Sequence, residues 1–183
     1  MMPRSSATNA RPLLPQGAEL ATPPSRLKVM ASLFAALCLT LLPWADELRW
    51  LLPDFTLMVL LYWCIHAPRL AGLGIAFMLG IVTDVSQGLL LGLDALAYCA
   101  AAFVALSVHK RLEGFDPPRQ TMQIAPLLLG KEALVLTLGM VFGRTVADWR
   151  YMAAGLVAVS LWLPLAMLLD HLTGRPALDA EPA

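Results

Sequence analysis

The sequence has little charge and few cysteines, and both shortages limit what the protein can be. Of its 183 residues, 14% are charged and 58% are hydrophobic, whereas soluble domains average about a quarter charged and about half apolar. The net charge is zero, which argues against nucleic acid as a partner because such binding needs a clustered basic face. The three cysteines lie far apart, without the paired spacing of a disulfide framework or a zinc site. The composition therefore favours a membrane protein without a metal centre.

Catalytic and nucleotide-binding motifs are also missing. The stretch from Gly139 to Thr145 is one residue shorter than a phosphate-binding loop and has Arg144 where that loop has lysine. The chain contains no Gly-x-Ser-x-Gly and no His-Glu-x-x-His sequence. The three histidines fall at the ends of predicted helices, where a solvated histidine is expected. We therefore expect neither an enzyme nor a cofactor.

Apolar runs fill most of the chain between residues 25 and 173. Only the last has an uncharged run near the ~20 residues that a simple membrane span needs. The second and third are short, so they span only with flanking residues or against neighbouring helices. We predict six transmembrane helices in an all-α bundle. The predicted helices are Val29–Trp44, Phe55–Ala67, Leu70–Thr83, Leu93–Val108, Met122–Phe142 and Tyr151–Leu169.

The basic residues predict the orientation, and composition predicts the tails. With six spans, nine Lys and Arg residues fall on the side of the termini and three on the other, which favours cytoplasmic termini. Residues 1–24 contain five prolines and scattered polar residues, and they cannot bury enough apolar surface to become ordered. We predict a disordered cytoplasmic tail over 1–24, a membrane domain over 25–173 and a cytoplasmic C-terminal tail over 174–183.

Two aspartates, Asp84 and Asp94, lie among glycines in an otherwise apolar stretch. A pair of intramembrane aspartates could share a proton in catalysis, but these two lie on one short connection, whereas such a dyad is usually assembled from separate helices. We favour a structural role, in which Asp84 ends the third helix and Asp94 caps the fourth. Gly88 and Gly92 would let the chain turn or approach another backbone closely, and their spacing also matches a small-residue helix contact.

Lys131 and Glu132 form a charged pair inside the fifth predicted helix. Adjacent residues of a helix point about 100° apart, so the two do not pair simply along one face. Either Asp84, Asp94 or a partner protein supplies the charge opposite Lys131, or the helix starts late and Lys131 reaches the cytoplasmic interface. Both interpretations stay open at this point.

The stretch that holds the second to fourth predicted helices has a distinctive set of residues. They are Pro53-Asp54, Tyr62-Trp63, Pro68, Gly72, Phe77, Gly80, Asp84, Gly88, Leu91-Gly92 and Ala95-Leu96. This pattern resembles the MreD family of rod shape-determining membrane proteins. Asp94 departs from the family pattern, in which a different polar residue follows Leu-Gly. The rest of the chain agrees with the family in size, hydropathy and helix number.

The resemblance implies a multi-pass bacterial inner-membrane protein of the cell-elongation complex. Its partners would be the periplasm-projecting MreC, the cytoskeletal MreB, the glycosyltransferase RodA and a penicillin-binding transpeptidase. Its fold would be a compact six-helix bundle, similar to the substrate-binding subunits of vitamin transporters.

We therefore expect a non-enzymatic scaffold that positions peptidoglycan synthesis proteins and helps to maintain rod shape. The alternative is a small-molecule-binding membrane subunit of a transporter, which the helix number and the outward-facing loop between the two aspartates permit. The candidate residues for helix packing or partner contact are Pro53, Asp54, Gly80, Asp84, Gly88, Gly92, Asp94, Lys131 and Glu132.

Overall fold

The computed structural model describes residues 25–45, 51–88, 91–112, 117–142 and 150–173. These residues form six α-helices and contain no strand, which confirms the all-α prediction. The two predicted tails, 1–24 and 174–183, lie outside the described residues. The helices are α1 Arg26–Leu41, α3 Phe55–His66, α4 Leu73–Gln87, α5 Leu93–Leu112, α6 Pro117–Val141 and α7 Arg150–Thr173.

Local signals explain where several helices begin and end. The Ser25 side chain accepts a hydrogen bond from the Lys28 amide, so α1 begins before the predicted Val29. Helix α6 begins at Pro117, since proline lacks the amide hydrogen that the first turn leaves unpaired anyway. Gly88 ends α4 in the left-handed conformation, with φ of +64°, which glycine adopts without a steric cost.

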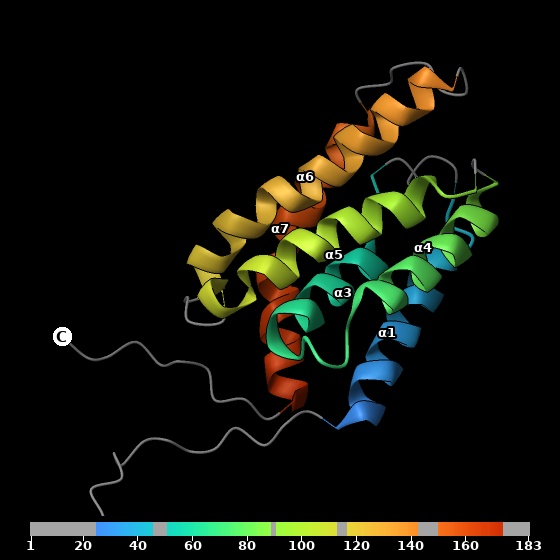
Figure 1. Ribbon diagram of the computed structural model, residues 1–183. Coiled ribbons are helices and arrows are strands. Elements are labelled where there is room, and N and C mark those ends of the chain that lie inside the picture. The colour runs from blue at the N-terminus through green and yellow to red at the C-terminus, as the bar shows by residue number, and fades with distance from the viewer. Residues whose placement is uncertain (1–24, 46–50, 89–90, 113–116, 143–149, 174–183) are drawn as a thin grey trace, which may run out of the picture.

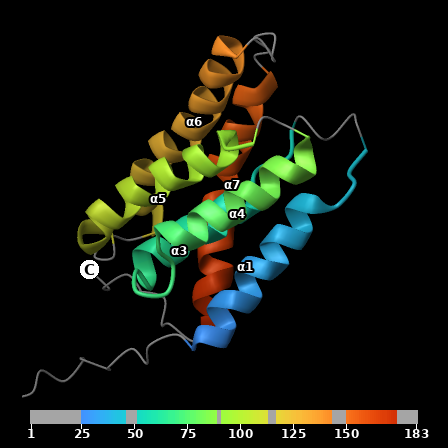
Figure 2. The ribbon, with the colours of Figure 1, turned by 45° about the vertical axis from the view of Figure 1, so that its right-hand side comes forward.

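Helix α3 occupies the centre of the bundle, as the two views in Figure 1 and Figure 2 show. Every residue from Thr56 to Ile65 is buried, and α3 contacts α1, α5 and α7. Polar side chains fix two of these contacts. The Trp63 indole donates to the Ser32 hydroxyl on α1 at 2.8 Å, and the Tyr62 hydroxyl donates to Asp170 on α7 at 2.6 Å.

Within the described residues, three helices have the length and apolar composition to cross a membrane, namely α5, α6 and α7. Helix α3 has only 12 residues, or about 18 Å at 1.5 Å per residue, against a hydrocarbon core of about 30 Å. Because its neighbours cover it on all sides, α3 does not have to meet the lipid along its own length. This arrangement agrees with the prediction for the second run, which α3 forms, that a short run depends on neighbouring helices.

Four of the remaining helices form two close pairs beside α3 (Figure 1). Helix α4 packs against α5, and α6 packs against α7. Gly155 on α7 permits the second contact, because a Cβ atom built there would lie 2.9 Å from Cδ2 of Leu129 on α6. Helix α5 also contacts α3 and α6, so it lies between the two halves of the bundle and carries residues of both regions described next.

Candidate functional site

Four ionisable side chains meet where the start of α3, the first turn of α5 and the middle of α6 come together. We call these side chains, Asp54, Asp94, Lys131 and Glu132, the charge cluster. The Lys131 ammonium lies 3.3 Å from Oδ2 of Asp54 and 3.5 Å from Oδ1 of Asp94. It also lies 3.3 Å from Oε1 of Glu132. One ammonium thus joins carboxylates from three helices.

The charge cluster is almost closed to the surroundings. Asp94 is 1% exposed, Glu132 7% and Lys131 8%. Charges held in a low-dielectric interior cost several kcal/mol each unless they are paired and hydrogen-bonded. Pairing is incomplete here, because three carboxylates face one ammonium. Neither oxygen of Asp94 accepts a hydrogen bond within the part of the chain that the structure describes.

The sequence interpretation of Lys131 and Glu132 needs two corrections. The adjacent side chains do contact each other, at 3.3 Å, because both chains bend toward the same buried site. The helix also does not start late, since α6 begins at Pro117, and Lys131 lies well inside it and is buried. Asp94 supplies an opposite charge, as one interpretation allowed, and Asp54 supplies another that the sequence did not suggest.

Asp54 has two roles in this region. Its Oδ1 accepts the Leu57 amide at 3.0 Å and so caps the start of α3. Its Oδ2 accepts the Tyr98 hydroxyl at 2.5 Å and faces Lys131. Pro53, the buried residue before it, restricts the chain that leads into the helix. An aspartate before an apolar run signals a helix cap, but nothing local reveals the partner of its second oxygen.

Sequence reasoning missed two polar residues that support the charge cluster. Tyr98 on α5 is fully buried and joins Asp54 to Thr83, whose hydroxyl lies 3.5 Å from the Tyr98 hydroxyl. Thr83 donates to the Leu79 carbonyl within α4. A tyrosine four residues after Asp94 lies on the same helix face, which is the one signal that could have included it.

Asp84 does not belong to the charge cluster. It lies inside α4, which continues to Gln87, so the prediction that Asp84 ends this helix is wrong. Its carboxylate caps the next helix. Its Oδ2 accepts the amides of Gly92 at 2.8 Å and Ala95 at 3.2 Å, and its Oδ1 accepts the amide of Asp94 at 2.8 Å. The amides of Asp94 and Ala95 belong to the first turn of α5, which leaves them without intrahelical partners, and Gly92 directly precedes this turn. We predicted Asp94 as the cap of this helix. That interpretation is wrong, because Asp84 makes the capping hydrogen bonds.

The glycines between and before the aspartates have distinct positions. Gly88 and Gly92 both have positive φ, +64° and +104°, so they serve the turn and do not form a helix–helix contact face. Gly80 makes the close contact between α4 and α5, since a Cβ atom there would lie 2.3 Å from Cα of Ala95. Small residues at such a crossing let two backbones approach.

The two aspartates are not arranged as a catalytic dyad. Both Asp84 oxygens are engaged by backbone amides, whereas Asp94 turns toward Lys131. The described residues also contain no group of three or more His, Cys, Asp or Glu side chains that could hold a metal ion. The ion pairs of the charge cluster hold α3, α5 and α6 against one another.

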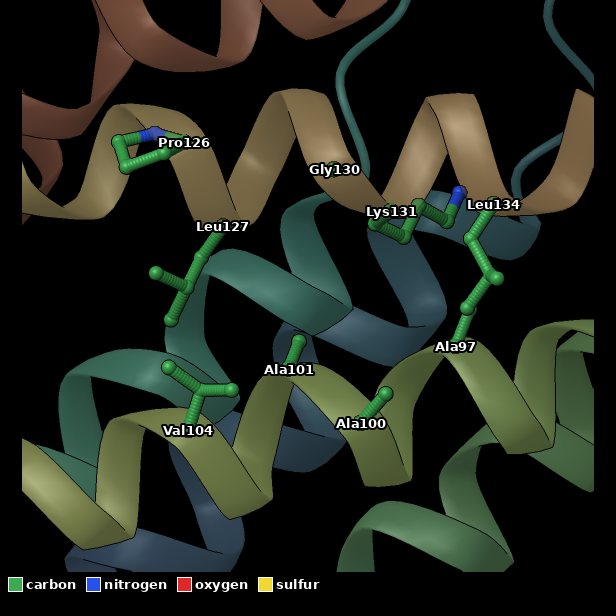
Figure 3. A pocket seen from close by; sticks show the side chains of 9 residues that line it. All are labelled: Ala97, Ala100, Ala101, Val104, Pro126, Leu127, Gly130, Lys131 and Leu134. Carbon is green, nitrogen blue, oxygen red and sulfur yellow. The ribbon is translucent and has the colours of Figure 1, made fainter.

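A groove of about 280 Å³ runs between α5 and α6, and Lys131 is the one residue of the charge cluster that lines it. We call it the α5–α6 groove. Figure 3 shows that small side chains of α5 face it from one side and that Lys131 enters it from α6. Its lining includes Ala97, Ala100 and Ala101 of α5 and Pro126, Gly130 and Lys131 of α6.

Comparison with known proteins gives the family. The model of the family described as rod shape-determining protein MreD matches residues 25–172. The chain belongs to the MreD family. It is also similar to the rod shape-determining protein MreD of Haemophilus influenzae, with 23% identity over 141 residues, which cover 77% of this chain and 86% of that protein. The match extends from α1 to α7, well beyond the second to fourth helices that carried the resemblance.

MreD membership supports a role in rod shape determination and a location in a membrane. No solved structure matches the chain. The expected similarity to the substrate-binding subunits of vitamin transporters therefore stays a prediction.

Proposed function

We propose that this protein is a non-enzymatic scaffold of the bacterial cell-elongation complex, which helps to maintain rod shape by positioning peptidoglycan synthesis proteins. The charge cluster is the observation that carries this proposal. Its buried ion pairs join α3, α5 and α6, so they hold a defined arrangement of helices. A scaffold needs such a fixed surface, because lipid provides little hydrophobic drive for helix association and specificity must come from packing and polar contacts.

The proposed partners are those of the complex that the family name implies. MreC is the expected direct partner, and MreB, RodA and a penicillin-binding transpeptidase join directly or through it. Helices α1, α4 and α5 expose large apolar side chains, among them Phe34, Phe77 and Phe103. These faces suit lipid or the membrane segments of partner proteins.

The proposed topology has six spans in the inner membrane, with both termini in the cytoplasm and with 1–24 and 174–183 as cytoplasmic tails. The burial of the short α3 supports it, because a short helix inside protein does not have to match the bilayer thickness. Fusions of alkaline phosphatase test it, since that enzyme is active only outside the cytoplasm. A fusion after Trp149 should be active and one after Arg111 inactive, and the opposite pattern contradicts the six-span topology.

A depletion strain tests the scaffold function. Cells that lose the protein should become round, and MreC should co-purify with the tagged wild-type protein from solubilised membranes. Cells that stay rod-shaped, together with no recovery of MreC, would overturn the proposal. A purified protein that retains a vitamin-sized ligand and binds an ATPase module would instead support the transporter alternative.

A further inference from the structure

Six exposed basic residues lie at one end of the bundle, where α1, α4 and α6 begin and α3, α5 and α7 end. Figure 1 and Figure 2 show these helix ends on the same side of the molecule. We propose that the six residues, which we call the basic rim, bind the headgroups of anionic phospholipids. The inference goes beyond the proposed scaffold function and does not depend on it. The basic rim consists of Arg26, Lys28, Arg69, Lys110, Arg111 and Arg119.

Half of the basic rim gathers where α5 ends and α6 begins. The Gln120 side chain donates to the Leu112 carbonyl at 3.4 Å and so ties the first turn of α6 to the end of α5. Arg119 precedes Gln120 in the chain, and Arg111 precedes Leu112. Together with Lys110 in the last turn of α5, they form a group of three cations. An anionic headgroup placed there faces several positive charges at once.

The described residues do not neutralise the basic rim. Every ion pair among them involves Lys131, which lies in the charge cluster. Asp170 is the one described carboxylate near this end, and its Oδ1 accepts the Tyr62 hydroxyl. The connection 113–116, outside the described residues, contributes Glu113 and Asp116, fewer charges than the three cations on either side of it. An excess of positive charge therefore remains.

The rim cations of α1 and α6 do not stabilise their own helices. Arg26, Lys28 and Arg119 lie in first turns that contain no acidic residue. The start of a helix carries a partial positive charge, so cations there are unfavourable. The Lys28 ammonium donates to the Leu172 carbonyl of α7 at 3.3 Å, which leaves its positive charge uncompensated. A negative charge from outside the chain would stabilise all three.

Exposed apolar side chains beside the rim favour lipid over a soluble acidic protein. Met30 follows Arg26 by four residues, and it is exposed. Met122 follows Arg119 by three residues, and it is exposed as well. Each methionine thus lies one turn farther into the bundle on the same helix face as its cation. A phospholipid contacts both through its phosphate and its acyl chains, and Lys and Arg clusters next to transmembrane helices are typical of anionic lipid binding.

Photo-crosslinking to lipid tests the inference. The full-length protein, with p-benzoylphenylalanine in place of Met122, is reconstituted in vesicles of equal parts phosphatidylglycerol and phosphatidylcholine with the same acyl chains. Mass spectrometry should find about fivefold more phosphatidylglycerol than phosphatidylcholine in the adducts, the equivalent of about 1 kcal/mol for one basic residue near anionic headgroups. Met140, an exposed methionine near the other end of α6, is the matched control position. A probe there should give a ratio closer to one.

Neutralising the cations of the α5–α6 group should remove the preference. The combined variant Lys110→Gln, Arg111→Gln and Arg119→Gln should lower the ratio at Met122 to near one. High salt should lower the ratio of the wild type in the same direction, because it screens exposed charges. A ratio that stays at its wild-type value under both changes would overturn the inference.

The pair Arg26→Gln and Lys28→Gln is the reciprocal control. A probe in place of Met30 should lose its preference for phosphatidylglycerol in this double variant and keep it in the α5–α6 variant. The probe at Met122 should behave in the opposite way, so that the preference kept at one position shows that each variant is folded. Equal ratios at Met122 and Met140 in the wild type, or loss of preference at both probes in either variant, would overturn the inference.

Discussion

Helix α5 has two different sides, and one aspartate marks each of them. Toward α4 the packing is closed, since a Cβ atom on Gly80 would lie 2.3 Å from Cα of Ala95. Asp84 lies on this side, and its carboxylate accepts three backbone amides. Toward α6 the packing is open, with a groove of about 280 Å³. Asp94 lies on that side, and its oxygens accept no hydrogen bond from the described residues.

The comparison separates a carboxylate that the fold satisfies, Asp84, from one that accepts no hydrogen bond within the described residues, Asp94. Asp84 and Asp94 have the same side chain, they are ten residues apart, and both are buried. Burial alone therefore does not show which buried carboxylate is structural. The hydrogen bonds decide it, because a satisfied carboxylate stabilises its own fold whereas an unsatisfied one carries a penalty.

Replacement of Lys131 by methionine should have the largest effect on the open side. The change keeps the length of the side chain and leaves three carboxylates buried without their cation. Removing one partner of a buried ion pair typically costs about 3–5 kcal/mol. The free energy of unfolding, from denaturant titration in mixed micelles, should fall by that amount. Lys28→Met is the matched control, since Lys28 is exposed; a loss of similar size there would mean that the burial of Lys131 is not the cause.

On the closed side, Gly80→Ala should separate α4 from α5. The added methyl group would overlap the backbone of Ala95, and overpacking of this kind costs about 1–3 kcal/mol. Gly130→Ala is the control on the open side, and it should be neutral or stabilise α6 by up to about 1 kcal/mol through helix propensity. Equal losses for the two variants would contradict the difference between the two sides of α5.

A smaller effect is expected for Tyr98→Phe, which removes the hydroxyl of a fully buried side chain on α5. The hydroxyl donates to the carboxylate of Asp54 at 2.5 Å, and hydrogen bonds to charged groups contribute about 1.5–3 kcal/mol. We expect a loss near the lower limit, because Lys131 still faces the same oxygen of Asp54. No change in the denaturation midpoint would show that this hydrogen bond does not contribute to stability.

The smallest effect should come from Gly88→Ala at the end of α4. Gly88 has φ of +64° and open space around it, so the cost is backbone strain alone, about 1 kcal/mol. The melting temperature in detergent should fall by a few degrees. A variant as stable as the wild type would show that the turn between α4 and α5 tolerates other conformations.

The sequence predicted the helices well, because their signals are local. Each helix coincides with one predicted apolar run, and caps such as Ser25 lie next to the helices that they start. The bounds of α6 were less well predicted, since its first turn, from Pro117, is polar and precedes the apolar run.

The candidate site could be predicted only in part, because its contacts join distant segments. Asp94 and Lys131 were selected as polar residues inside apolar runs. The contact of Lys131 with Asp54 spans 131 − 54 = 77 residues, and it depends on how α3 and α6 cross. The cap role was assigned to the wrong aspartate for a related reason. A carboxylate inside the preceding helix reaches the start of α5 only because the chain reverses at Gly88 and Gly92.

The two isosteric variants Asp84→Asn and Asp94→Asn, compared in the same unfolding experiment, test the central claim most directly. In the wild type, both oxygens of Asp84 accept backbone amides. Asp84→Asn replaces one of these oxygens by an NH2 group, which cannot accept, and each backbone amide left without an acceptor should cost about 1–3 kcal/mol. Asp94→Asn removes no hydrogen bond from the described structure but weakens the ion pair between Asp94 and Lys131. Because Asp54 and Glu132 still face the Lys131 ammonium, the free energy of unfolding should stay within about 1 kcal/mol of the wild type. Equal destabilisation by both variants, or a larger loss for Asp94→Asn, would contradict the account.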